Sequence, residues 1–477
     1  MFYAKFPARI VATLSAAAIG IAISAAPRVG DDWLSDSIPA RWSDDNHFSQ
    51  TMPSEDSWWH NFNDTLLDSL IAEGEKNNFN LQQAWRNIEM ARVALQQARS
   101  GYFPTLDLQA GWSTSRSSGA ISGPSVAAST TSGFSAGISM NWEIDVFGRV
   151  AASAKEKKSL YSASRADYAS TMVSLCSQIA TAYVDLRMYQ AQLAVTKRHI
   201  DSEEKILAIT KAREEAGIAS MLDVSQASTV YYSTIATVPA LETSIHTTIN
   251  AINILVGAEP GTFNAILEQP RDLLPYDMIV DAGIPMELLR RRPDVVAAEY
   301  QIEADAAALG IAKKEYLPSL SLTGSIGTSA HDARDLAKNN AFTYSIAPTL
   351  SWTIFDGMSR KYDVASAREQ MMAAIDVYNQ TVLTAVEEVD NSMFSYINAL
   401  KYIDQIDKVV ESSQKSLDLS VSLYKRGLSQ FYNVVEAQTS VLSYENTLMQ
   451  AKCQAVLDLI NLYKALGGGW TADSLGQ

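Results

Sequence analysis

The sequence has little of what catalytic and metal sites need. Its five histidines are scattered without the spacing that metal ligands require, so we expect neither a metal nor a cofactor. Its only cysteines, Cys176 and Cys453, are predicted to be small buried hydrophobes and not a disulfide. A Gly-x-Ser-x-Gly pattern at 133–137 begins a predicted strand, whereas a nucleophile of this kind needs a sharp strand-to-helix turn. We therefore do not expect an enzyme.

Basic charge and long apolar runs are scarce as well. The formal net charge of −15 and the pI near 4.9 argue against a nucleic-acid partner, which would need a basic face. No apolar run reaches 18 residues, so no transmembrane helix is predicted. Residues 1–26 have the form of an export signal, with Lys5 and Arg9 before a short apolar run that ends in small residues. A buried or frayed N-terminal helix is the alternative.

Two very long stretches, from Gly148 to Glu215 and from Met358 to Lys425, contain no proline and no glycine beyond their first residue. As helices that rise ~1.5 Å per residue, each would reach ~100 Å. Within both, apolar residues recur at steps of seven, which predicts coiled-coil helices with one continuous contact seam. The seam residues are Met172, Ile179, Leu186, Leu193, Ile200 and Leu207 in the first stretch, and Val382, Val389, Tyr396, Ile403, Val410, Leu417 and Tyr424 in the second.

A glycine ends each long stretch, and the two glycines lie 210 residues apart. Gly217 opens the segment 217–224 and Gly427 opens the segment 427–434, and each is predicted to form a tight turn between two antiparallel helices. The recurrence predicts two tandem repeats, which override the domain count that length alone suggests. The expected division is a signal peptide at 1–26, a strap at 27–78, repeat 1 at 79–257, a linker at 258–285, repeat 2 at 286–468 and a tail at 469–477.

Four tryptophans lie near the start of the expected mature chain. Trp33, Trp42, Trp58 and Trp59 show no periodicity, so we expect them to pack an irregular strap onto the body of the protein. A sugar-stacking or membrane-interface patch is the alternative.

The apolar period changes from 3.6 to 2 inside each repeat, at 105–145 and at 319–354. Apolar residues such as Leu106, Leu108 and Trp112 alternate with polar ones, and a loop separates two such runs, so each segment is predicted to be a β-hairpin. Strands with one apolar and one polar face suit a transmembrane β-barrel. Four strands cannot close a barrel, so other copies of the chain would have to complete it. A soluble half-buried sheet is the alternative.

Three consecutive arginines precede the first helix of repeat 2. They could bind a phosphate or a lipid headgroup. However, Pro293 and Asp294 suit the first turn of a helix. We therefore favour a structural junction that consists of Arg291, Arg292, Pro293 and Asp294.

Several short motifs occur in order along nearly the whole chain: the Arg-Arg-Arg-Pro-Asp junction, Tyr-Phe-Pro at 102–104 and Tyr-Leu-Pro at 316–318, Phe-Gly at 147–148 and Phe-Asp-Gly at 355–357, and Leu-Gly-Gly-Gly-Trp at 466–470. Together they resemble the outer membrane factor family of TolC/OprM-like channels, and within it the NodT-type efflux branch. The resemblance implies a mainly α fold with a transmembrane β-barrel. Three protomers would give four strands each to one 12-stranded barrel, and their long helices would form a periplasmic α-barrel.

The resemblance also implies a function and partners. The homotrimer would be the channel-tunnel of a tripartite efflux pump in the bacterial outer membrane, and it would passively export drugs or other small toxic compounds. Its partners would be outer membrane lipid, a periplasmic adaptor (membrane fusion) protein and an inner-membrane pump of the resistance-nodulation-division type. Type I protein secretion and metal-ion efflux are the transport alternatives, and a coiled-coil envelope scaffold is the structural one. Many members of this branch carry a lipidated N-terminal cysteine, and this chain has no cysteine near the expected cleavage region.

Finally, the resemblance implies a gate at the periplasmic ends of the helices. By position, the gate would fall on the second hairpin, and Asp223 would be its counterpart on the first. Its candidate residues on the second hairpin are Glu436, Asn433, Ser429 and Phe431, which would be the aromatic residue of the gate ring. Related channels often have aspartates where this chain has Ser429 and Asn433, so the charge of the gate would depend mainly on Glu436. A solvated helix face is the alternative for Glu436.

Overall fold

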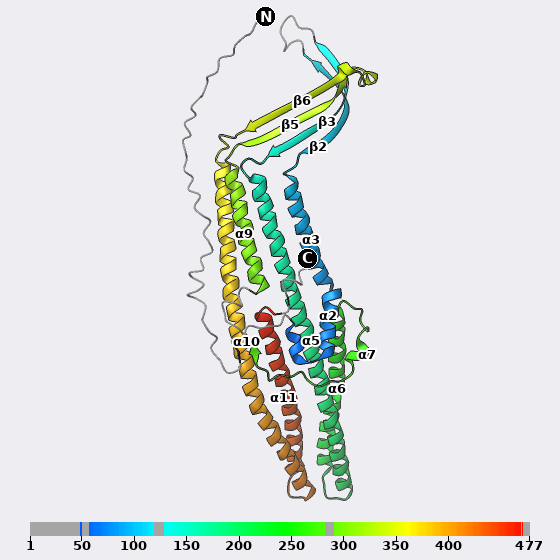
Figure 1. Ribbon diagram of the computed structural model, residues 1–477. Coiled ribbons are helices and arrows are strands. Elements are labelled where there is room, and N and C mark those ends of the chain that lie inside the picture. Colours follow the sequence, from blue (N-terminus) through cyan, green and yellow to red (C-terminus); the bar gives the residue numbers. More distant parts are fainter. Residues whose placement is uncertain (1–47, 50–56, 119–127, 282–290, 469, 471–477) are drawn as a thin grey trace, which may run out of the picture. The chain divides into compact units, whose positions relative to one another are not determined.

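The computed structural model describes residues 48–49, 57–118, 128–281, 291–468 and 470. The predicted export signal, Trp33, Trp42 and the tail after Trp470 lie outside these residues. Long helices and one four-stranded antiparallel sheet make up most of the described chain (Figure 1), which confirms the predicted mainly α fold with two β-hairpins.

The elements follow one another in the order that the two repeats predict. The α-helices of the described residues are α2 (Thr65–Asn77), α3 (Phe79–Ser100), α5 (Arg149–Glu215), α6 (Met221–Leu255), α7 (Asn264–Leu267), α9 (Pro293–Lys314), α10 (Ser359–Lys425) and α11 (Phe431–Ala465). The strands are β1 (Phe48–Ser49), β2 (Thr105–Ser117), β3 (Ser129–Ile144), β4 (Val280–Asp281), β5 (Ser319–Ala330) and β6 (Phe342–Ser351). Short 3-10 helices lie at Trp58–Phe62, Ala333–Asp335 and Asn339–Ala341.

The sheet has the strand order β2-β3-β5-β6, and its neighbouring strands are all antiparallel. One row of apolar residues crosses the four strands: Leu108, Ile138, Ile326 and Tyr344. The adjacent row is polar: Asp107, Ser139, Ser325 and Ser345. Because successive residues of a strand point to opposite faces, the sheet has one apolar and one polar face, as the alternation predicts.

The apolar face of the sheet is open, and so are both of its edges. Leu108 is 80% exposed and Tyr344 is 74% exposed. Within the described chain, β2 and β6 each pair with a neighbour on one side only. Both features call for a covering layer or neighbour that one protomer does not supply.

The long helices α5 and α10 contain 67 residues each, which corresponds to about 100 Å. Residues of the predicted seams are buried in both helices, and Ile179, Leu186 and Tyr396 are completely covered. Each long helix turns at a glycine into a return helix of 35 residues, α6 or α11. The seven-residue pattern therefore marks the faces that pack.

The helices form two open rows. Beside the sheet, α3 packs on α5, α5 on α9 and α9 on α10, in the same order as the strands to which they are joined. Nearer the glycine turns, α6 packs on α5, α5 on α11 and α11 on α10. Helix α10 is thus at the edge of both rows, and α3 and α6 form the opposite edges (Figure 1).

The largest buried cluster joins the two repeats near the middle of the long helices. Leu67, Leu70 and Ile71 of α2 are at most 1% exposed within it. Trp58 stacks on Tyr463 of α11 with ring centroids 5.3 Å apart. Segments from both ends of the described chain therefore cover the same core.

A helix occupies part of the segment 27–78, where the sequence predicts an irregular strap. Helix α2 begins at Thr65 because the Asp64 carboxylate accepts hydrogen bonds from the amides of Leu66 (2.9 Å) and Leu67 (3.3 Å). The sequence did not predict this helix because its apolar residues recur at helical spacing over only 13 residues. The aperiodic tryptophans of the same segment hide so short a pattern. Trp58 and Trp59 are buried, as expected of packing residues.

The segment between the repeats lies against α10. Strand β4 pairs in parallel with β1, and the hydroxyl of Tyr396 donates a hydrogen bond to the carbonyl of Tyr276 (2.8 Å) and accepts one from the amide of Met278 (3.0 Å). These bonds satisfy the polar groups of an irregular segment on a buried surface.

Candidate functional site

The two hairpin turns have the same backbone geometry. Gly217 and Gly427 have φ values of 70° and 71°, in the left-handed region that favours glycine. At the first turn, the Ile218 amide donates to the Arg213 carbonyl (2.8 Å). At the second, the Leu428 amide donates to the Leu423 carbonyl (2.9 Å). These bonds satisfy the last carbonyls of α5 and α10 and let the chain reverse at once.

The return helix of the first hairpin has a complete capping box. The Asp223 amide donates to the Ser220 hydroxyl (3.2 Å), and the Ser220 amide donates to the Asp223 carboxylate (3.4 Å). Asp223, the predicted counterpart of the gate, thus stabilises the start of α6.

The return helix of the second hairpin lacks such a cap. Its N-cap residue is Gln430, whose side chain makes no capping hydrogen bond. Asn433 stands where the first hairpin has Asp223, and its side-chain amide donates to the Ser429 hydroxyl (2.9 Å). Two predicted gate residues, Asn433 and Ser429, are therefore bonded to each other at an exposed turn.

Glu436 and Asn433 line one groove between α10 and α11. The groove has a volume of about 790 Å³, and serines of α10 form much of its other side: Ser412, Ser413, Ser416 and Ser420. Glu436 is exposed, and in the described residues it has no hydrogen-bond or ion-pair partner. A free carboxylate one turn beyond Asn433 is available to a group from another chain.

Phe431 does not line this groove. It is 2% exposed and lies in an apolar cluster that joins both hairpins at their ends, with Leu207, Ala227, Tyr424 and Val434. Its ring meets the ring of Tyr424 at 5.0 Å between centroids and 60° between planes. In this structure Phe431 is a packing residue between hairpins, and its ring does not face solvent.

Arg213 connects the two hairpins, and the sequence analysis missed it. From the last turn of α5, its Nη1 donates to the carbonyl of Lys425 (2.9 Å), the last residue of α10. Its guanidinium also lies 5.0 Å from the ring centroid of Tyr424. A cation at the C-terminal end of a helix interacts favourably with the helix dipole. The only sequence signal was a basic residue in the last turn of α5, which is common, and its partner lies 212 residues away.

A second link joins the hairpins further from the turns. His199 of α5 lies 3.0 Å from the carboxylate of Glu445 in α11, and both side chains are largely covered. Arg198 approaches the same carboxylate at 3.8 Å, with its side chain 72% exposed. The first hairpin thus holds the second at two levels.

Glu203 is a buried acid one turn from His199. Its side chain is 3% exposed, and the Thr234 hydroxyl of α6 donates to one of its oxygens (3.1 Å). The other oxygen is buried without a hydrogen-bond partner in the described residues. Burial raises the pKa of Glu203 from 4.5 to about 7, and the bond from Thr234 opposes this effect.

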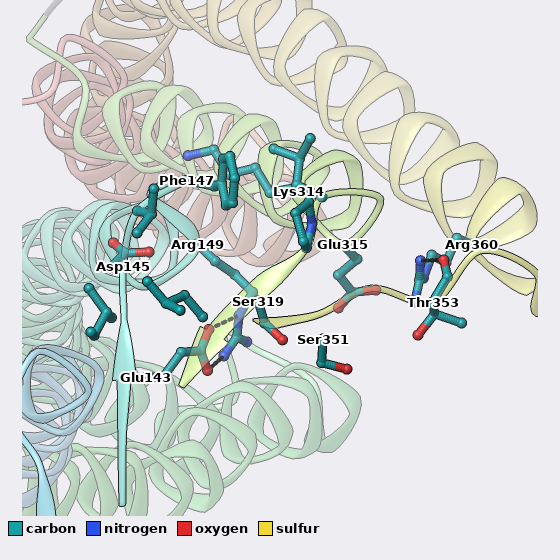
Figure 2. A pocket seen from close by; sticks show the side chains of 15 residues that line it. Glu143, Asp145, Phe147, Arg149, Lys314, Glu315, Ser319, Ser351, Thr353 and Arg360 are labelled. Atoms are coloured by element: carbon teal, nitrogen blue, oxygen red, sulfur yellow. Dashed lines mark hydrogen bonds and ion pairs between the residues drawn. The ribbon is translucent and has the colours of Figure 1, made fainter. Parts of the chain in front are cut away.

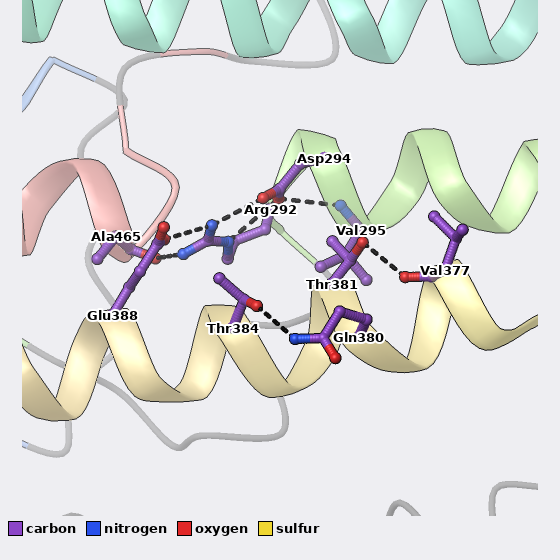
Figure 3. Close-up of polar contacts among 9 residues, drawn as sticks. All are labelled: Arg292, Asp294, Val295, Val377, Gln380, Thr381, Thr384, Glu388 and Ala465. Atoms are coloured by element: carbon purple, nitrogen blue, oxygen red, sulfur yellow. Dashed lines mark hydrogen bonds and ion pairs between the residues drawn. The ribbon is translucent and has the colours of Figure 1, made fainter.

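The arginine junction ties three helices together (Figure 3). Arg292 Nη1 donates to the carbonyl of Ala465 at the end of α11 (2.8 Å), and Nη2 donates to Asp294 and Glu388 (2.7 Å each). Pro293 begins α9, and Trp470 Nε1 donates to the Arg291 carbonyl (3.2 Å). Of the four predicted junction residues, Arg292 makes the contacts that join α9, α10 and α11, and it is 8% exposed.

Across the described residues, no group of three or more His, Cys, Asp or Glu side chains is arranged to hold a metal ion. Cys176 and Cys453 are buried and free. None of the helices in the described ranges is both long and apolar enough to cross a membrane.

Comparisons with known proteins agree with this architecture. The family model described as "Outer membrane efflux protein" matches residues 70–258 and 284–468, one segment in each repeat. "Nodulation protein T" of Rhizobium leguminosarum bv. trifolii is 27% identical over 438 residues, which cover 91% of this chain and 92% of that protein. "Pyoverdine export outer membrane protein OpmQ" of Pseudomonas aeruginosa is 29% identical over 426 residues and 88% of each protein. The solved outer-membrane channel OprN matches with a TM-score of 0.84 and 27% identity, over 91% of this chain and 97% of that one.

Proposed function

Since the chain belongs to the outer membrane efflux protein family, it is the outer membrane channel of an efflux pump, and we propose that three copies form one passive export tunnel. Drugs or other small toxic compounds enter this tunnel from the periplasmic side and leave through a β-barrel. The tunnel is closed at its periplasmic end until the helical hairpins separate.

The observation that carries this proposal is the pair of matching open edges. The sheet ends in β2 and β6, and the helix rows end in α3 or α6 on one side and in α10 on the other. A ring of copies would pair β6 with the next β2 and would cover α10 with the next α3 and α6. Exposed apolar residues occur at these edges, including Met90 on α3, Tyr232 on α6 and Phe394 on α10. Three copies of four strands give a barrel of 12.

The open apolar face of the sheet supports insertion into lipid. On β3, Trp142 lies eight positions beyond Phe134, which is ~26 Å along the strand. Strand β6 also has aromatic residues at both ends, with Phe342 as its first residue and Trp352 just after its last. An apolar band between two aromatic rows, tilted to the membrane normal, matches an outer membrane barrel.

The gate in this proposal is the second hairpin. Asn433 and Glu436 present polar groups at its end, and Phe431 anchors it to the first hairpin. Arg213 acts as an intramolecular latch through Lys425 and Tyr424. Opening breaks these contacts and swings the hairpin outward, a change between two packed arrangements.

The proposed partners are a periplasmic adaptor protein and an inner-membrane pump of the resistance-nodulation-division type. The Pseudomonas relative is named for pyoverdine export, which supports small-molecule cargo. Type I protein secretion and metal-ion efflux predict other inner-membrane partners. Identification of the transporter that copurifies with the trimer therefore distinguishes these alternatives.

Planar-bilayer conductance of purified Arg213→Ala tests the channel and its latch together. Loss of a charged hydrogen bond and a cation–π contact removes about 1–3 kcal/mol from the closed state, roughly a 5- to 150-fold shift toward opening. We expect higher basal conductance, and more antibiotic entry in cells. Arg198→Ala on the same helix is the matched control, because its exposed side chain makes only a 3.8 Å contact.

Two negative outcomes have different meanings. If Arg213→Ala conducts no more than wild type, Arg213 is not part of the closed-state latch. If neither the wild type nor any variant forms pores, the trimeric channel itself is refuted.

A further inference from the structure

The polar face of the sheet carries very few charges. Among the residues of β2, β3, β5 and β6, only Asp107, Arg116 and Glu143 are charged. Arg116 belongs to the alternate β2 residues that include Leu106 and Trp112, on the apolar face. Asp107 and Glu143 are thus the charged residues that these strands place on the polar face.

Glu143 is neutralised by Arg149, the first residue of α5 (Figure 2). Arg149 Nε donates to one carboxylate oxygen of Glu143 at 2.9 Å, and Nη2 donates to the other at 2.5 Å. This bidentate geometry pairs the two charges closely. Near the start of α10, Arg360 is also paired, since its Nε lies 3.3 Å from the carboxylate of Asp356.

Asp107 has no such partner. In the described residues it makes no ion pair, and its neighbours on the polar face are Thr105, Gln109 and, directly opposite, Ser139. Glu143 lies four residues beyond Ser139 on β3, which is ~13 Å further along the strands than Asp107. This distance exceeds the Debye length, which is ~10 Å at 0.1 M salt. The pair of Glu143 and Arg149 therefore leaves the charge of Asp107 uncompensated.

At the helix end of the strands, Lys314 donates to the Gly148 carbonyl (2.7 Å), beyond the level of Glu143. Strand β6 and the loops at the far end of the strands add no compensating charge either. Strand β6, which would meet β2 of the next copy, has no charged residue. By sequence, residues 118–128 between β2 and β3 have none. Between β5 and β6, Asp335 is paired with Lys338 (2.7 Å), and Asp332 lies 3.6 Å from Arg334.

We propose that Asp107 sets the ion preference of the barrel, where three copies form a ring of uncompensated carboxylates that favours cations and cationic cargo over anions. This inference rests on the trimeric channel proposed above. It assigns a selectivity role to one position of the barrel lumen, separate from the gate at the hairpin turns.

The dimensions of a 12-stranded barrel make such a ring effective. Strands ~4.8 Å apart and tilted by ~40° give a circumference of ~75 Å and a backbone diameter of ~24 Å. Side chains narrow the lumen further, so a permeating ion comes within about one Debye length of a carboxylate at 0.1 M salt. Screened Coulomb interactions in water then predict roughly a five-fold preference for monovalent cations, which fades toward 1 M.

Reversal potentials in a KCl gradient near ~0.1 M test this assignment. Channels are measured in the Arg213→Ala background, so that the periplasmic end limits the current less. Asp107→Asn is expected to lower the ratio of cation to anion permeability by roughly two- to five-fold. Asp107→Glu is the matched control, because it keeps the charge and therefore the preference. Arg149→Gln frees the charge of Glu143 and is expected to raise the ratio.

Conducting Asp107→Asn channels with an unchanged reversal potential would overturn the role of Asp107 and leave the channel intact. If Asp107→Asn fails to assemble, as judged by the trimer band on a gel, Asp107→Ser decides, because it matches the Ser139 opposite and also removes the charge: an unchanged ratio overturns the inference. If no variant conducts, the channel and the inference both fail.

Discussion

The first hairpin should lose stability as the pH rises through the neutral range, because of Glu203. The folded hairpin holds the proton of this buried acid up to about pH 7, whereas the unfolded chain releases it near pH 4.5. The folded state binds the proton more tightly, so stability is greatest below pH 4.5 and falls as the pH rises toward 7. At 1.36 kcal/mol per pH unit, the loss approaches ~3 kcal/mol above pH 7.

The substitution Glu203→Gln removes this titration. A glutamine side chain stays neutral, keeps an acceptor for the Thr234 hydroxyl and puts an amide where the unpartnered oxygen lies. Hydrogen exchange of amides in α5 and α6, between about pH 5 and pH 8 and corrected for intrinsic rates, reports the local opening free energy. We expect the wild type to lose ~2.5 kcal/mol more than Glu203→Gln over this range.

Glu204→Gln provides the matched control, because Glu204 is the exposed neighbour on the same turn and should leave the pH dependence unchanged. The link between His199 and Glu445 is present in all three proteins, so the difference between the curves isolates Glu203. Equal pH dependence in the wild type and in Glu203→Gln, or a hairpin that becomes more stable at pH 8, would refute the reasoning.

Three other changes test the remaining contacts. Glu436→Gln should raise basal conductance or antibiotic entry if Glu436 closes the gate through a partner on the next copy; an unchanged closed state removes it from the gate. Gln430→Ser should cap α11 and raise the free energy of opening of its first turn by about 0.5–2 kcal/mol, measured by slower amide exchange there. Unchanged exchange would mean that the turn does not accept a cap. Arg292→Met leaves the Ala465 carbonyl and the Glu388 carboxylate without their shared donor. The free energy of unfolding, measured by thermal denaturation, should fall by about 2–4 kcal/mol. A variant as stable as the wild type contradicts the junction role.

Features that depend on local spacing could be predicted from the sequence. The bounds of α5 and α10 follow from the absence of proline and glycine, and the buried faces follow from steps of seven residues. The two faces of the sheet follow from strict alternation. In each case, neighbouring residues along the chain carry the information.

Features that depend on distant partners could not be predicted. In the sequence, Arg213 is an ordinary basic residue near a helix end. Its role depends on Lys425 and Tyr424, which only the fold places beside it. Phe431 was predicted as the aromatic residue of the gate ring, and an apolar residue next to a turn can face a lumen or another helix with the same local pattern. Only the packing of both hairpins shows that its ring is buried.

The two repeats share one backbone plan but differ at their turns, and the differences favour the second hairpin as the moving part. The first hairpin is stabilised from within by the capping box of Ser220 and Asp223. The second has no side-chain cap on α11 and is held from outside, through Arg213 and the cluster around Phe431. An element that depends on a neighbour's contacts can move when those contacts break, without unfolding itself. In the proposed opening, the Arg213 latch and the apolar contact around Phe431 break at the ends of the hairpins, while every helix keeps its internal hydrogen bonds.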